Sequence, residues 1–214
     1  MFDLDGTLVD SKDAIVDSAM RILKLYNFEG LAESDIRKSI GLPVEVVFGK
    51  VIKGDALISV TKAFREDLLL RGSGKTTLYS GVEKFLASHS DKNTIKVVVT
   101  NKPKELATYV LKELGVLKHF KLIVGPDITL APKPSPSIIQ HVLRIFPNCS
   151  RALMVGDRKE DIEAARAAGV TSVLMIHPDH DFYISAESKP DYTSYGFKNL
   201  ETLIQLGEND NGNR

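Results

Sequence analysis

The first ten residues contain three aspartates, Asp3, Asp5 and Asp10, in the segment FDLDGTLVD. On an extended backbone Asp3 and Asp5 would point to the same side and repel each other, so a positive group is expected between them. An EF-hand calcium loop does not fit, because glycine is fourth instead of sixth and Ala14 stands where a glutamate is needed. An Asp-Gly turn at a strand end would also explain the segment. Other residues must therefore decide between a turn and a site.

Three further polar clusters follow apolar runs or precede a helical pattern. They are Thr100-Asn101-Lys102 after VVV, Lys133 in the loop APKPSP, and Gly156-Asp157 after LMV. Ligands of open parallel sheets gather beyond the carboxyl ends of the strands, so all these groups are expected at one edge. Together they supply three carboxylates, a hydroxyl and a lysine. This set suits a hard divalent cation, an anionic group and a nucleophile.

The elements that would position these residues alternate between strand and helix patterns. Short apolar runs rich in β-branched residues predict strands at 95–99, 122–124, 152–155 and 172–176, and the segments between them predict helices at 104–114, 135–146 and 160–168. Strands that are apolar throughout and separated by helices indicate an α/β fold with a parallel sheet covered on both faces.

Residues 11–71 have a different pattern, with apolar residues at helical spacing nearly throughout. We expect a small helical cap domain at 11–78, inserted into a core domain formed by 1–10 and 79–214. The linkers 9–11 and 71–78 would form a hinge, and Gly72 and Gly74 suit the second one. The GSGKT in that linker is not a nucleotide-binding phosphate loop, because Leu69 occupies the position of the first glycine and no strand precedes it.

Composition excludes several classes of function. The chain has 214 residues, 43% of them hydrophobic, and 28 Lys+Arg balance 28 Asp+Glu, so no global charge draws it to nucleic acid or to an anionic membrane. Cys149 is the only cysteine and cannot form an internal disulfide. Neither an 18-residue apolar run nor a signal-peptide pattern is present. A cytoplasmic protein is expected, as a monomer or a homodimer.

Four segments in order, DLDGTLVD, VVVTNKP, KPSP and MVGDRKEDIEAARAAG, resemble the motifs of the haloacid dehalogenase superfamily. The match extends from Phe2 to about Val173, and each motif falls at a predicted strand end or loop. The sequence is most similar to the phosphoglycolate phosphatase-like branch with a helical, C1-type cap. The resemblance implies a Rossmann-like core and a Mg²⁺-dependent phosphatase that acts on small phosphorylated metabolites.

The resemblance also implies the catalytic roles. Asp3 would be the nucleophile that forms an aspartyl-phosphate, and Asp5 the general acid and then the general base. Asp3, the backbone carbonyl of Asp5 and Asp157 would bind Mg²⁺. Asp161 would support a metal-bound water without binding the metal itself.

The phosphoryl group would be held by Thr100, the backbone amide of Asn101 and the amides near Gly6. Lys133 would neutralise its charge and orient Asp3. A phosphoglycolate-like substrate is expected. A sugar phosphomutase of the same family and a nonenzymatic binding or regulatory protein on the same fold stay open as alternatives.

Substrate selection is expected from the cap, from SIGLP at 39–43 and from nearby basic residues, Arg37, Lys38, Lys50 and Lys53. Arg158 stands where many relatives have a small residue, and it would pair with a neighbouring acid or touch the substrate. A polar loop explains HPDHD at 177–181 better than a second metal site at His177 and His180. Only Met1 and Phe2 precede Asp3, so the first strand is short or the start of the chain is incomplete.

Overall fold

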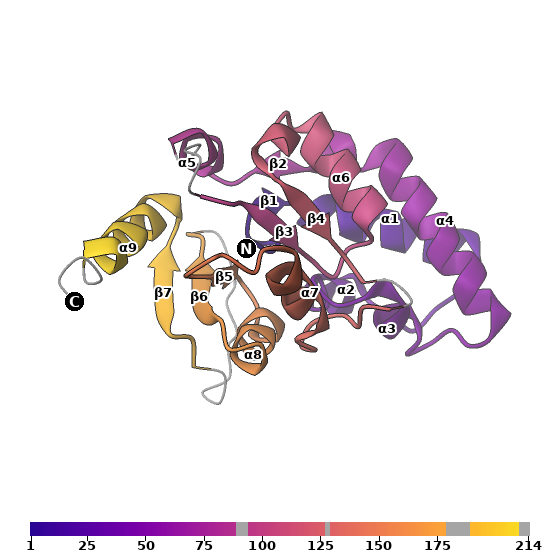
Figure 1. Ribbon diagram of the computed structural model, residues 1–214. Coiled ribbons are helices and arrows are strands. Elements are labelled where there is room, and N and C mark those ends of the chain that lie inside the picture. Colours follow the sequence, from indigo (N-terminus) through magenta and orange to yellow (C-terminus); the bar gives the residue numbers. More distant parts are fainter. Residues whose placement is uncertain (89–93, 127–128, 179–188, 210–214) are drawn as a thin grey trace.

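The computed structural model describes residues 1–88, 94–126, 129–178 and 189–209 (Figure 1). Its main sheet consists of two groups of strands joined by Phe2, which forms parallel bridges to Val98 on one side and to Val155 on the other. The spatial order is β4, β3, Phe2, β5, β6, β7, and all pairs are parallel. The strands are β3 (Val97–Val99), β4 (Leu122–Val124), β5 (Leu153–Gly156), β6 (Thr171–Ile176) and β7 (Tyr192–Tyr195). The predicted parallel α/β fold is confirmed.

Helices cover both faces of this sheet (Figure 1). On one face α5 (Val82–Ser88), α6 (Lys104–Glu113) and α9 (Phe197–Asn209) pack against Phe2 and Val98, and on the other α7 (Ser137–Ile145) and α8 (Lys159–Ala167) pack against Val97, Val99 and Met154. Each helix buries one stripe of apolar residues, such as Ile138, Ile139 and Val142 in α7. A short 3₁₀ helix, η2 (Leu117–His119), follows α6. The sheet is therefore the central layer of three.

The region between Asp10 and Thr77 is helical, as predicted. It contains α1 (Lys12–Leu25), α2 (Glu33–Lys38), α3 (Val44–Phe48), α4 (Asp55–Arg71) and the 3₁₀ helix η1 (Ser73–Lys75). The chain enters and leaves it through β1 (Val9–Asp10) and β2 (Thr77–Leu78), which pair antiparallel. We propose that residues 11–78 are a separate cap domain, since its helices share an apolar cluster to which α6 adds Leu106. The paired linkers would then act as the hinge.

Some predicted elements differ from the observed ones at their ends. The strand predicted at 95–99 begins at Val97, and Ile95, which is 36% exposed, lies outside the buried part of the sheet. The helix predicted at 135–146 runs from Ser137 to Ile145, directly after Pro136. Such shifts of one or two residues are usual at helix and strand ends.

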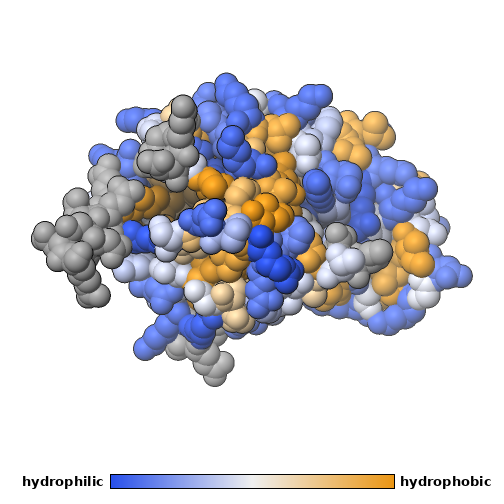
Figure 2. Space-filling model, in the orientation of Figure 1, coloured by the Kyte–Doolittle hydropathy of each residue, from blue (hydrophilic) through white to orange (hydrophobic). Residues whose placement is uncertain are grey.

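The surface carries a mixture of charged and apolar residues. On the face in Figure 2, hydrophilic residues form most of the rim, and hydrophobic residues gather toward the middle. Among the helices in the described part of the chain, none has the length and the hydropathy needed to cross a membrane.

Candidate active site

The predicted site residues meet at the carboxyl edge of the sheet. Asp3 follows Phe2, Thr100 follows β3 and Asp157 follows β5, and these three segments are neighbours in the sheet. Lys133 comes from the loop before α7. All four side chains are buried. The parallel register therefore brings together residues that are far apart in the sequence, as expected.

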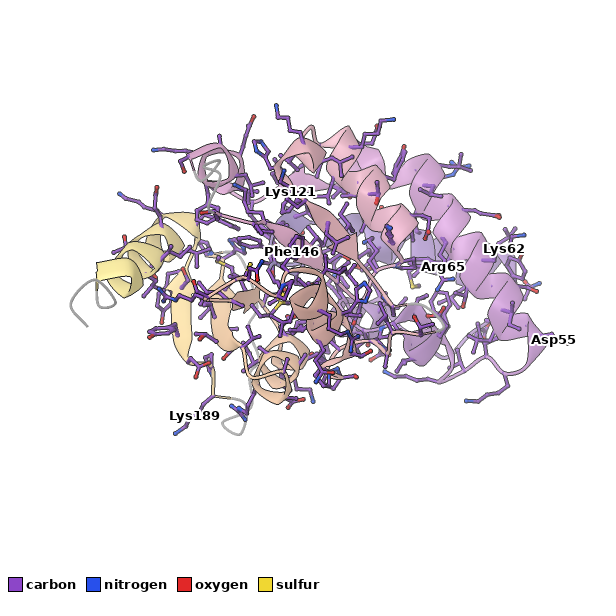
Figure 3. All side chains as sticks on the ribbon, in the orientation of Figure 1. Asp55, Lys62, Arg65, Lys121, Phe146 and Lys189 are labelled. Carbon is purple, nitrogen blue, oxygen red and sulfur yellow. The ribbon has the colours of Figure 1, made fainter. Side chains whose placement is uncertain are left out.

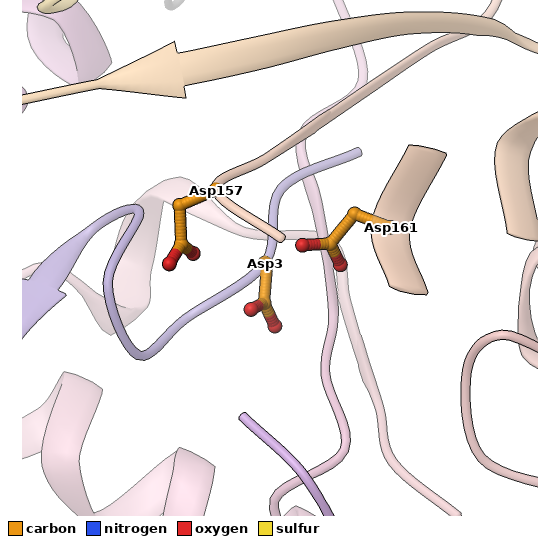
Figure 4. A group of neighbouring side chains, drawn as sticks. All are labelled: Asp3, Asp157 and Asp161. Atoms are coloured by element: carbon orange, nitrogen blue, oxygen red, sulfur yellow. The ribbon is translucent and has the colours of Figure 1, made fainter. Parts of the chain in front are cut away.

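Three carboxylates form the centre of the site. One oxygen each of Asp3, Asp157 and Asp161 lies within 4.8 Å of the others. Figure 4 shows these groups converging from the N-terminal segment, the loop after β5 and the start of α8. Burial and the charges of Asp3 and Asp161 raise the pKa of Asp157 well above its usual value. Burial also raises the pKa of Asp161 to about 6, against the opposing effect of Lys133. The cluster therefore needs protons or a cation.

Lys133 supplies one positive charge to this cluster. Its Nζ lies 2.9 Å from Asp3 Oδ1 and donates to Asp161 Oδ1 at 2.5 Å and to the carbonyl oxygen of Val99 at 2.8 Å. Burial alone would lower the pKa of the Lys133 ammonium, but Asp161 and Asp3 outweigh it and raise the pKa above its usual range. The side chain is therefore charged and held in place by three oxygens.

The residues present fit a small divalent cation. Asp3 Oδ1 is buried and takes part in no hydrogen bond with the described residues, because the nearby Lys133 ammonium lacks hydrogen-bond geometry. Its lone pairs are thus available to a metal ion. The donors are all oxygens, which is the set that Mg²⁺ prefers. Both oxygens of Asp161 are already occupied, by Lys133 and by the backbone amide of Arg158 at 3.0 Å, which agrees with a supporting position.

Gly6 and Thr7 fix the carboxylate of Asp157. Thr7 Oγ1 donates to Asp157 Oδ1 at 2.8 Å. Gly6 has a φ of +86°, and a Cβ there would lie 2.3 Å from Asp157 Oδ2. Only glycine combines this left-handed conformation with such a close approach. Thr7 was missed by sequence reasoning, although it stands inside the first motif.

Asp5 forms an ion pair with a second lysine, Lys102. Lys102 Nζ donates to both carboxylate oxygens of Asp5, at 2.7 and 2.6 Å, and Ser11 Oγ donates to Oδ1 at 2.5 Å. The lysine and Asp5 side chains are each 8% exposed, so this is a buried ion pair. The positive groups beside Asp3 and Asp5 in this structure are thus two different lysines. Lys102 belongs to the predicted polar cluster after β3, but nothing in its position along the chain indicated this partner.

Asn101 contributes its side chain as well as its backbone. Its Nδ2 donates to the carbonyl oxygens of Gly41 at 3.0 Å and Lys133 at 3.1 Å, and its Oδ1 accepts the amide of Lys133 at 2.7 Å. Asn101 therefore links the lysine loop to the cap. Arg158 does pair with a neighbouring acid, since its Nε donates to Glu160 Oε2 at 3.2 Å.

A cavity of about 520 Å³ opens between the core and the cap beside Asp3 and Asp5. Its core side includes Thr100, Asn101 and Lys102. Most of its remaining wall is apolar. The cap supplies Ile15, Ala19, Ile36, Leu42, Val44, Val47, Phe48, Phe64 and Leu68, and the core supplies Leu106. On the cap side the charged residues are Glu45 and Arg65, which pair with each other. Arg65 lies on the side of α4 that faces the core (Figure 3).

The cap residues proposed for specificity divide into two groups. In the SIGLP segment, Ser39, Gly41, Leu42 and Pro43 line the cavity. Arg37, Lys38, Lys50 and Lys53 all lie within the described ranges, and none of them lines it. Arg37 instead pairs with Glu33 and Asp13 on the outside of the cap.

His177 is not part of the group formed by Asp3, Asp157 and Asp161. Its Nε2 lies 2.9 Å from the carbonyl oxygen of Thr7, and its ring stacks on Tyr79 with 3.7 Å between the ring centroids. Burial lowers the pKa of His177. His180 lies outside the described residues. His177 therefore supports the loop that holds Asp157.

Comparisons with known proteins agree with this geometry. Residues 1–175 match the family model described as haloacid dehalogenase-like hydrolase. The phosphoglycolate phosphatase of Aquifex aeolicus is 33% identical, over 98% of this chain and 96% of that protein. The phosphoglycolate phosphatase of Vibrio parahaemolyticus is 30% identical, over 96% and 95%. A haloacid dehalogenase-like family hydrolase from Streptococcus pneumoniae has a solved structure with a TM-score of 0.80 and 25% identity, covering 96% of each chain. The chain therefore belongs to the haloacid dehalogenase-like hydrolase family, in its phosphoglycolate phosphatase-like branch.

Proposed function

We propose that this phosphatase hydrolyses small phosphomonoesters in two steps, through a phosphoryl group carried on Asp3 and with Mg²⁺ as cofactor. The proposal rests mainly on the surroundings of the Asp3 carboxylate. This carboxylate is buried at the sheet edge beside a charged lysine, one of its oxygens has no hydrogen bond with the described residues, and it lines the cavity. A carboxylate in this setting is available as a nucleophile.

In the first step an oxygen of Asp3 attacks phosphorus, and the bond from phosphorus to the ester oxygen breaks. Asp5 gives a proton to that departing oxygen, so the product leaves as a neutral alcohol. In the second step a water molecule attacks the same phosphorus and gives its proton to Asp5. The bond to Asp3 then breaks, inorganic phosphate leaves, and both carboxylates return to their starting states.

The other residues of the site stabilise the charge that these steps move. Asp3, Asp157 and the backbone carbonyl of Asp5 would hold Mg²⁺, which neutralises negative charge on the phosphoryl oxygens when it is bound. Lys133 adds a second positive charge next to Asp3, and Thr100 and the backbone amides near Asn101 and Gly6 donate to the phosphoryl oxygens.

Lys102 holds the carboxylate of Asp5 through two hydrogen bonds, which fixes its orientation toward the cavity. When Asp5 carries the proton that it later donates, its attraction for the Lys102 ammonium weakens. The lysine can then stabilise an anionic group of the substrate near the ester oxygen. This arrangement is compatible with phosphoglycolate, the substrate named for the relatives, whose carboxylate lies two bonds from that oxygen.

The cavity favours a phosphatase over the two alternatives. A sugar phosphomutase must satisfy many substrate hydroxyls, and the mostly apolar cap wall offers few partners for them. A nonenzymatic binding protein would not need the assembled set of Asp3, Asp5, Lys133 and Asp157. We further propose that the enzyme acts in the cytoplasm on small metabolites, as a monomer or a homodimer.

The proposal is tested with the variant Asp3→Asn on a panel of phosphomonoesters that includes phosphoglycolate and an aryl phosphate. We expect no turnover and no acid-stable phosphoprotein in this variant, because an amide is a poor nucleophile. Asp55→Asn is the matched control, since Asp55 is exposed at the start of α4, and it should keep the turnover of the parent. Undiminished activity of Asp3→Asn would overturn the mechanism, and activity unchanged by a chelator would overturn the role of Mg²⁺.

A further inference from the structure

Arg158 of the core binds one short segment of the cap, residues 38–41. The Nη1 of Arg158 donates to the carbonyl oxygen of Lys38 at 3.3 Å and to that of Ile40. Its Nε donates to the carboxylate of Glu160, which is 5% exposed. One side of the guanidinium is thus fixed to the core while the other binds the cap. The planar, branched donor set of arginine suits such a bridge, whereas a lysine presents a single ammonium group.

The cap segment has a shape that admits this side chain. Gly41 has a φ of +93°, and a Cβ at this position would lie 2.4 Å from Arg158 Cδ. The stem of Arg158 therefore lies directly against the Gly41 backbone. The two residues fit each other only while residue 41 has no side chain.

Asn101 also binds the same cap residue, Gly41. The Gly41 carbonyl oxygen accepts a hydrogen bond from Asn101 Nδ2, and the other two hydrogen bonds of that amide are made with the backbone of Lys133. Arg158 is also connected to Lys133 through Asp161, because the Arg158 backbone amide and the Lys133 ammonium both donate to the carboxylate of Asp161. Residues 38–41 are thus linked to Lys133 through two short chains of hydrogen bonds.

We propose that Arg158 is a positioning residue that holds residues 38–41 of the cap on the core, so that docking of the cap and placement of Lys133 occur together. The inference rests on the proposed phosphatase function, in which Lys133 stabilises the phosphoryl group. When residues 38–41 move away, the Arg158 guanidinium loses both carbonyl acceptors but keeps Glu160. Asn101 Nδ2 then keeps only the Lys133 carbonyl. A docked cap also excludes water from the space around Asp3, which strengthens the electrostatic interactions there.

The test uses Arg158→Ala and Arg158→Lys, with Arg166→Ala as the matched control. Arg166 lies near the end of α8, which Arg158 directly precedes, and it is exposed and donates to the carbonyl oxygen of Lys189. Both Arg158 variants keep the backbone amide that binds Asp161. We expect Arg158→Ala to lower kcat/KM by about tenfold to a hundredfold, as for the loss of hydrogen bonds from a charged donor. Amide hydrogen exchange at residues 38–43 should become faster. Arg158→Lys should recover part of both effects, and Arg166→Ala should change neither.

Gly41→Ala, made in the parent and in Arg158→Ala, distinguishes loss of the contact between Gly41 and Arg158 from a general loss of stability. Gly41→Ala should lower kcat/KM strongly in the parent, because the new methyl group meets Arg158. It should have a smaller effect in the Arg158→Ala background, where the clash with Arg158 is absent and only the strain of a side chain at a φ of +93° remains. An equal effect in both backgrounds would overturn the inference, as would kinetics and exchange of Arg158→Ala within twofold of the parent. If the parent hydrolyses no phosphomonoester, the proposed function fails, and the exchange measurements alone then decide whether Arg158 holds the cap.

Discussion

Gly6→Ala should displace the carboxylate of Asp157, and Gly169→Ala provides a control for the backbone. Both glycines have left-handed conformations, with φ of +86° and +70°, but a Cβ at Gly169 would have nothing within 4 Å. In both variants, placing a side chain on a left-handed backbone lowers the free energy of unfolding by about 1–2 kcal/mol. Gly6→Ala must also move Asp157, which would then lose its hydrogen bond from Thr7. A hydrogen bond to a charged group contributes about 1.5–3 kcal/mol, so the free energy of unfolding is expected to fall by about 2.5–5 kcal/mol for Gly6→Ala and by about 1–2 kcal/mol for Gly169→Ala.

The assay is urea denaturation of both variants and the parent, with Mg²⁺ and with a chelator. A cation that binds only the folded state raises the free energy of unfolding by an amount set by its affinity. Gly169→Ala should keep the Mg²⁺-induced increase of the parent, and Gly6→Ala should lose most of it, because Asp157 no longer reaches the metal. Equal stability of the two variants, or an equal response to Mg²⁺, would refute the assignment of Asp157 as a ligand fixed by Gly6.

Two further predictions concern Asp5 and Asp161. Asp5→Asn should slow hydrolysis by about 10²–10⁴-fold for esters of poor leaving groups and by less for aryl phosphates, which need little proton transfer. An equal loss along a series of leaving groups would show that Asp5 is not the acid. Burial raises the pKa of Asp161 to about 6 in the folded protein, so the folded state holds a proton that the unfolded state releases near pH 4. The stability of the metal-free protein should therefore fall as the pH rises from about 4 to above 6, by linkage. Thermal unfolding in a chelator measures this decline, which should be smaller in Asp161→Asn, and the same pH dependence in both proteins would contradict it.

The sheet and the motif residues at its edge could be predicted because each depends on a local signal. A strand buried on both faces is a continuous apolar run, and VVV at 97–99 and VLMI at 173–176 are of this kind. Once the strands are parallel, the residues that follow them must lie at one edge. This placed Asp3, Thr100 and Asp157 together without any knowledge of the loops.

The partners of the long side chains could not be predicted in this way. The contact of Lys102 with Asp5 depends on how the chain turns after β3, and that of Arg158 with residues 38–41 depends on where the cap docks. The sequence pattern shows which face of a cap helix is buried, but not which part of that face borders a cavity. For this reason basic residues such as Lys38 and Lys50 were assigned to substrate selection, whereas the charged cap residues of the cavity wall are Glu45 and Arg65.

The position of Phe2 between β3 and β5 has a consequence for the order in which the protein folds. The helices between Asp10 and Thr77 pack mostly against one another, with Leu106 of α6 as a later addition, so most of their contacts can form early during synthesis. Phe2 has no neighbour in the sheet until Val98 has been made, and its second neighbour, Val155, comes much later. Ribosomes add about 5–20 residues per second, so about 8–30 seconds pass between the synthesis of Phe2 and that of β5. Asp3, the proposed nucleophile, is thus synthesised well before the strands that flank it in the sheet, and a nascent chain released before β5 would contain the cap helices without the assembled candidate site.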